Sequence, residues 1–126
     1  MNIENLTYGD VRKISALVGQ QTQIEDAEVG DGRPVIVRSR DAGVLFGHFA
    51  GRVGSTVKLR NARQMWHWKA AQGGTLIDCA KHGVEIEACK FSVATATAQV
   101  FNACTLIDCH MAAAGTIEAV KGGDWS

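Results

Sequence analysis

Five basic and aromatic residues stand close together near the middle of the chain, and their types suit a ligand that is both anionic and flat. They are Lys58, Arg60, Arg63, Trp66 and Trp68. Arginine binds a phosphate group through two parallel hydrogen bonds, and a base stacks on an indole ring. The cluster therefore predicts a nucleotide-like ligand. The same pattern also fits a purely structural role, in which the tryptophans fill the core and the basic residues lie on a solvated edge strand, where they prevent pairing with another chain.

The four cysteines, Cys79, Cys89, Cys104 and Cys109, are predicted to be free thiols that fill the core. Their spacing lacks the paired C-x-x-C of structural zinc sites. Cys79 and His82 would share one face of a helix, and Cys109 could approach them. Because the pattern remains unlike a zinc site, we expect no metal and no other cofactor.

No catalytic signature is present in the sequence. It contains neither the G-x-S-x-G nucleophile elbow nor the His-Glu pairs of zinc hydrolases. The glycine-rich run at residues 47–54 matches no phosphate-binding motif and falls in a predicted hairpin. We therefore expect a protein that is not an enzyme, and an uncharacterised enzyme ranks third behind two non-enzymatic functions.

The composition is that of one folded domain spanning residues 1–126, with 46% apolar residues available for a core. Thirteen Lys and Arg residues balance thirteen Asp and Glu residues, whereas proteins that grip long nucleic acids carry a basic excess. No apolar run approaches the roughly 20 residues that cross a bilayer, and no basic signal-peptide region begins the chain. We expect no membrane, no long nucleic acid and a cytoplasmic location.

Hydrophobic periodicity predicts the elements that would position these residues. Residues 6–18 have helical spacing. Three alternating segments joined by short turns, at residues 34–38, 43–50 and 56–60, predict an antiparallel meander, since such turns cannot make a parallel crossover. Val57 and Leu59 would face the core, so that Lys58 and Arg60 project outward. Residues 65–68 predict a further, separate strand.

The second half of the chain mixes helices and strands. Residues 75–82 predict a short helix with Thr75 as its N-cap, Asp78 at N3 and Gly83 after its end. Residues 89–96 and 99–109 favour strands, and residues 111–120 favour a last helix. The pentapeptide Thr-Leu-Ile-Asp-Cys occurs twice, once in the predicted helix and once in a predicted strand.

The predicted fold class is α+β. It is a small curved antiparallel sheet of five or six strands, a meander or partly open barrel, with short helices packed on one side. An N-terminal helix lies in residues 1–19, the sheet-rich core in residues 34–110, and the C-terminal helix and tail in residues 111–126. Exposed sheet edges favour a homo-oligomer.

Two segments carry a family resemblance. The motif N-A-R-x-x-W-x-W at residues 61–68 and C-K-F-S at residues 89–92 are its most specific parts. Over residues 34–110, the chain resembles a family of short phage and prophage proteins that contain a domain of unknown function. The resemblance implies a phage origin, and hence a location in the host cytoplasm, and it implies no activity.

Two functions of different classes follow from these observations. The first is a phage accessory protein that binds and sequesters a nucleotide-derived host immune signal, an anti-defence role, through the basic and aromatic cluster at or near a subunit boundary. The second is a structural or protein-interaction module, such as a virion accessory part or an inhibitor of a host enzyme. The sequence leaves both open.

Overall fold

The computed structural model describes residues 27–123. Among these residues, 27–29 with 52–54 belong to one unit, and 30–51 with 55–123 belong to another. In the first unit, β2 (Ala27–Val29) is exposed, and the Nε of Arg52 lies 3.5 Å from a carboxylate oxygen of Glu28. The helix predicted at residues 6–18 and the last residues of the tail lie outside the described part of the chain.

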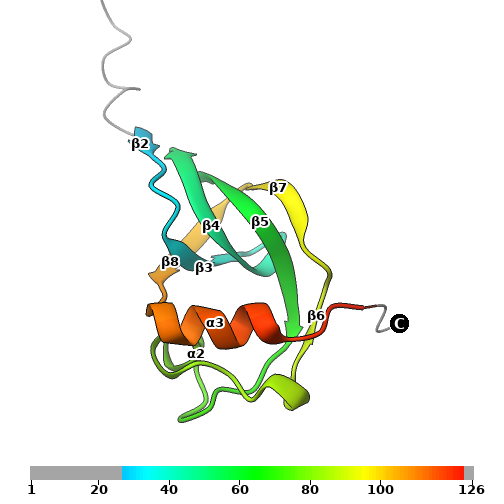
Figure 1. The fold of residues 1–126 in the computed structure, drawn as a ribbon. Helices are drawn as coiled ribbons and strands as arrows, with labels where there is room; N and C mark the ends of the chain where they lie inside the picture. The colour runs from blue at the N-terminus through cyan, green and yellow to red at the C-terminus, as the bar shows by residue number, and fades with distance from the viewer. Residues whose placement is uncertain (1–26, 124–126) are drawn as a thin grey trace, which may run out of the picture. The chain divides into compact units, whose positions relative to one another are not determined.

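In the remaining elements, each of the two helices follows a group of three strands (Figure 1). Their bounds are β3 Pro34–Ser39, β4 Gly43–Val53, β5 Thr56–His67, α2 Leu76–His82, the 3-10 turn Ile86–Ala88, β6 Lys90–Phe91, β7 Thr95–Val100, β8 Ala103–Asp108 and α3 Met111–Ala119. Both predicted helices in this part of the chain are therefore confirmed, as is the α+β class.

The strands form one mostly antiparallel sheet in the order β6-β5-β4-β3-β8, with β7 paired to β5 and β2 to β4. The meander β3-β4-β5 is confirmed, and Ile36 of β3 stands opposite Phe46 of β4 and Ile107 of β8. The sheet has seven strands and is open, because its outer strands β6 and β8 do not pair with each other. The prediction of five or six strands is wrong in number: β2 is additional, and residues 89–109 form three strands instead of two.

The strand β5 also corrects a prediction, because it joins two segments that the sequence pattern separates. Asn61 adopts a left-handed conformation with φ of 49°, and the strand continues through it. Val57 and Leu59 before Asn61 belong to one buried cluster, as expected, whereas Met65 after it belongs to the other. The buried side chains of β5 therefore pack on one face of the sheet before Asn61, and Met65 packs on the other face after it.

The sheet is buried on both faces, as β3 demonstrates. Ile36 packs in a cluster with residues of α2 and α3, among them Cys79 and Ile117. Its neighbours Val35 and Val37 pack on the opposite face in a second cluster to which neither helix contributes. Both helices thus cover the same face of the sheet, in agreement with the prediction that they pack on one side (Figure 1).

The helix α2 begins as its sequence predicts. The Thr75 side chain accepts a hydrogen bond from the backbone N–H of Asp78, and the Asp78 side chain accepts one from the backbone N–H of Thr75. The second copy of the pentapeptide lies in β8, where Thr105 stands opposite Arg38 of β3. The two copies adopt different structures because glycines precede the first copy, whereas pairing with β3 holds the second one extended.

Replacing Thr75 with alanine should lower the free energy of unfolding by about 1 kcal/mol, since it removes the N-cap of α2. The matched control is Thr105→Ala, the same position of the other pentapeptide, where Thr105 is exposed. That substitution should change the free energy of unfolding by less than about 0.5 kcal/mol. Urea denaturation of the three proteins measures both effects, and equal losses would contradict the assigned cap.

Candidate functional site

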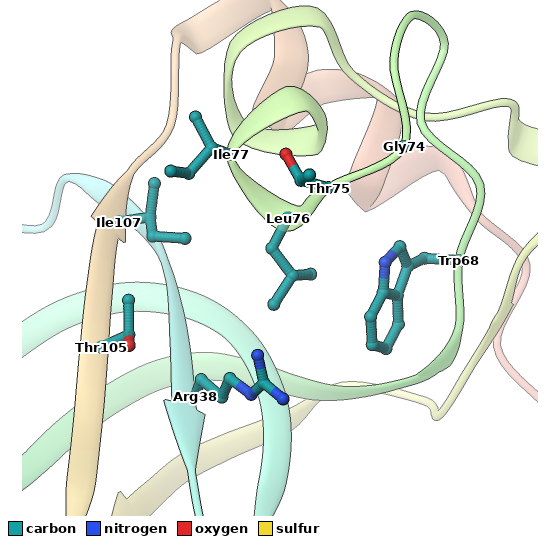
Figure 2. Close-up of a pocket in the computed structure, with 8 residues that line it drawn as sticks. All are labelled: Arg38, Trp68, Gly74, Thr75, Leu76, Ile77, Thr105 and Ile107. Carbon is teal, nitrogen blue, oxygen red and sulfur yellow. The ribbon is translucent and has the colours of Figure 1, made fainter.

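A cavity of about 410 Å³ opens between the sheet and the start of α2 (Figure 2). Its lining residues come from β3, β8, the segment that follows β5, and α2. They are Arg38, Trp68, Gly74, Thr75, Leu76, Ile77, Thr105 and Ile107. This volume lies in the range of about 300–1,000 Å³ that is usual for small-molecule sites, toward its lower end.

Two side chains in the cavity can recognise a ligand directly. Arg38 is the one exposed residue of β3. Trp68 is half-buried and packs against the buried cluster to which α2 and α3 contribute. Figure 2 shows the guanidinium and the indole extending from different sides into the space beneath Leu76. Within residues 27–123, neither side chain has a hydrogen-bond or ion-pair partner. A guanidinium and an indole N–H are therefore both available to a ligand.

The walls of the cavity are largely apolar. Leu76 and Ile77 come from the first copy of the repeated pentapeptide, and Ile107 comes from the second. The two copies, though one is helical and the other extended, thus line one cavity from α2 and from β8 (Figure 2). Apolar walls with a few placed polar groups are typical of small-molecule binding sites.

The backbone N–H groups of Gly74 and Thr75, directly before α2, are already occupied. A carboxylate oxygen of Asp78 accepts hydrogen bonds from the N–H of Gly74 at 3.0 Å, the N–H of Thr75 at 3.0 Å and the hydroxyl of Thr75 at 2.9 Å. The backbone N–H groups of Thr75 and Gly74 hold the pKa of Asp78 below its ordinary value of 3.8. An ionised carboxylate therefore stands directly behind this part of the wall at neutral pH.

Of the five residues that the sequence predicted as a binding cluster, Trp68 alone lines this cavity. Lys58 and Arg60 project from β5 as expected, opposite Gln99 and Thr97 of β7. Arg60 lines a separate cavity of about 220 Å³ together with His48. The sequence analysis missed Arg38, and its signal was a lone charged residue inside a strand that is otherwise buried.

The structure places Arg63 in the interior, where its guanidinium binds backbone oxygens. Its Nε donates to the carbonyl of Ser92 at 2.9 Å, and its Nη1 donates to the carbonyls of Ile117 at 3.1 Å and Glu118 at 3.3 Å. Burial lowers the pKa of Arg63, and the charge of Glu118 opposes that shift. The Ile117 carbonyl also accepts from the N–H of Val120 at 3.3 Å, and Arg63 adds a charged donor to these last carbonyls of α3.

Trp66 lies apart from the cavity. Its side chain is 59% exposed, and the Nζ of Lys90 lies 5.9 Å from its ring centroid. The five residues first grouped by sequence are thus divided among the exposed face of β5, the interior and the cavity. The structure does not bring these five side chains together into one site.

Three of the four thiols are buried, as the sequence predicted, and the fourth, Cys104, is exposed. Burial raises the pKa of Cys79 to about 11 and that of Cys109 to about 12, and it also raises the pKa of Cys89. In the described part of the chain, no three His, Cys, Asp or Glu side chains are grouped so that they could hold a metal ion.

Fold and site together define a small α+β domain with an open antiparallel sheet and a largely apolar cavity that is lined by one cationic side chain, Arg38. The chain belongs to the family of a domain of unknown function (DUF6948), whose sequence profile matches residues 32–117. The matched region includes every residue that lines the cavity. Searches of curated proteins and of solved structures find no match. Among helices of the described residues, none is long and apolar enough to cross a membrane.

Replacing Arg63 with methionine should lower the free energy of unfolding by about 2–3 kcal/mol, because it removes the charged donor from the partly buried carbonyl of Ser92 and from the buried carbonyl of Ile117. Arg60→Met is the matched control on the same strand, since Arg60 is exposed. It should cost less than about 0.5 kcal/mol. If chemical denaturation gave the two variants equal stability, the capping role of Arg63 would be wrong.

Alkylation of the native protein with iodoacetamide near neutral pH should modify Cys104 and spare Cys79, Cys89 and Cys109. The thiolate is the reactive form, and burial both shields the other three sulfurs and raises their pKa values. Peptide mass spectrometry identifies the modified residue, and urea-denatured protein, in which all four should react, is the control. Rapid labelling of Cys79 in the native state would contradict the packing described above.

Proposed function

We propose that this protein is a non-enzymatic binding protein that holds a nucleotide-like small molecule in the cavity between Arg38 and Trp68. The observation that carries the proposal is that a guanidinium and an indole, neither with a hydrogen-bond partner among residues 27–123, face one apolar cavity. Arginine pairs with phosphate oxygens through its planar fork, and an indole offers a stacking face to a base. Leu76 and Ile107 would cover the remaining ring surface.

The residues around the cavity favour binding over catalysis. General acid–base chemistry needs a group that gains and loses a proton near the working pH. None of the eight lining residues is a His, Asp, Glu, Lys, Tyr or Cys, the side chains that usually take this role. The neighbouring carboxylate of Asp78 is engaged by the start of α2. A ligand held here would be bound and released unchanged.

The resemblance to short phage and prophage proteins supports a phage origin, and it suggests what such binding would accomplish. A phage protein that captures a nucleotide-derived signal in the host cytoplasm would prevent that signal from activating an immune response. Capture requires only affinity and abundance, which a small binding domain supplies. The sheet is open in the described part of the chain, and an open sheet favours a homo-oligomer as the active form.

A second candidate is a protein-interaction module, and the exposed apolar residues beside β6 favour it. Trp66 is 59% exposed and Val93 is 67% exposed. Large exposed aromatic residues are frequent anchors of protein interfaces. Under this alternative, Trp66→Ala would abolish partner binding, and the cavity variants would leave that binding intact.

A thermal-shift screen against nucleosides, mononucleotides and cyclic nucleotides tests the proposed function. A ligand present at 100 times its Kd should stabilise the protein by about 2.7 kcal/mol. Arg38→Gln and Trp68→Ala should abolish the shift, because they remove the charge partner and the stacking face. The matched controls, Arg40→Gln and Trp66→Ala, alter exposed residues outside the cavity and should preserve it. A shift that survives Arg38→Gln but is lost in Trp66→Ala would place the ligand elsewhere.

A further inference from the structure

We infer that the cavity selects a nucleotide carrying a single negative charge on a phosphodiester, as in a cyclic mononucleotide, over nucleotides with terminal phosphate groups. This inference rests on the proposed function and names the ligand class of the same cavity. Three features of the described residues carry it: the number of cations in the cavity, the state of the donors at the start of α2, and the character of the walls.

The cavity offers one positive charge. Arg38 is the only charged residue among the eight that line it. A guanidinium satisfies the two free oxygens of one phosphodiester with two parallel hydrogen bonds. A terminal phosphate, and still more a triphosphate, brings further negative charge that would be withdrawn from water without a partner.

Asp78 occupies three of the donors at the start of α2 and places a negative charge beside them. The Asp78 carboxylate takes the backbone N–H groups of Gly74 and Thr75 and the hydroxyl of Thr75. These donors are unavailable to a ligand unless the cap of α2 breaks. The same carboxylate is a negative charge behind two lining residues, and it would repel a second phosphate.

The rest of the lining favours a flat, weakly hydrated body. Leu76, Ile77 and Ile107 present apolar surface, and the Trp68 indole presents a ring face (Figure 2). The volume of about 410 Å³ is that of a site for one small molecule. A neutral nucleoside would match these walls, but it would cover the Arg38 guanidinium without pairing it, which weakens binding. Both the uncharged and the multiply charged ligands are thus disfavoured.

Isothermal titration calorimetry of the full chain with adenosine, cyclic AMP, AMP and ATP, and with the corresponding guanosine series, tests the inference. In whichever series, adenosine or guanosine, binds more tightly, the cyclic nucleotide should bind at least about tenfold more tightly than the nucleoside, the monophosphate and the triphosphate. This is a difference in binding free energy of about 1.4 kcal/mol. Arg38→Gln should weaken binding of the cyclic nucleotide about tenfold or more, whereas the nucleoside should bind at least as tightly as before, because no charge is then covered without a partner. Arg40→Gln, the matched control, should alter neither affinity.

The outcomes separate this inference from the proposed function. Equal or tighter binding of AMP or ATP, lost in Trp68→Ala, would overturn the single-charge selectivity and leave a nucleotide site in place. Equal binding of the nucleoside and the cyclic nucleotide would overturn the role of Arg38 as the anion partner. Absence of binding by every compound, with a folded protein verified by its thermal transition, would overturn the proposed function itself.

Discussion

The hydrogen bonds of the buried Arg63 guanidinium hold β5, the segment at Ser92 and the end of α3 together, and the arrangement of the helices on the sheet depends on them. The guanidinium joins β5 to the carbonyl of Ser92 and to the last carbonyls of α3, so one side chain connects three segments that are distant in sequence. The position of α3 in turn sets that of α2, since the N–H of Val84 donates to the Thr116 hydroxyl at 3.0 Å. The N–H of His110 likewise donates to the carbonyl of Ala80 at 2.9 Å. Because α2 provides one wall of the cavity, the geometry of the candidate site depends on a residue that does not line it.

The burial of β3 on both faces explains why the cavity has a single strong charge. Five of the six residues of β3 are buried, and Arg38 is the exception. A second cation among these buried positions would lose its hydration without gaining a partner. Before α2, the Asp78 carboxylate takes the N–H groups of Gly74 and Thr75, and its negative charge opposes a second anionic group there. The domain thus combines a stable core with a site of limited and defined charge, which is the physical basis of the proposed selectivity.

The sequence predicted those parts of the fold that local rules determine. Short turns required the β3-β4-β5 meander, and the Thr75 cap and Gly83 marked both ends of α2. The continuity of β5 was not predictable, because the left-handed conformation of Asn61 has no strong sequence signal. The site was predicted less well than the fold. Arg38 becomes a site residue only through the pairing of β3 with β8, and such long-range pairing is not visible in a single sequence.

The central claim is that the ligand lies between Arg38 and Trp68, and the indole N–H signals of the protein test it most directly. Trp66 and Trp68 are two residues apart but differ in surroundings, since only Trp68 lines the cavity. In a proton–nitrogen correlation spectrum, titration with a cyclic mononucleotide should shift the indole signal of Trp68 and leave that of Trp66 in place. A shift confined to Trp66, or no shift of the Trp68 signal at saturating ligand, would contradict the account.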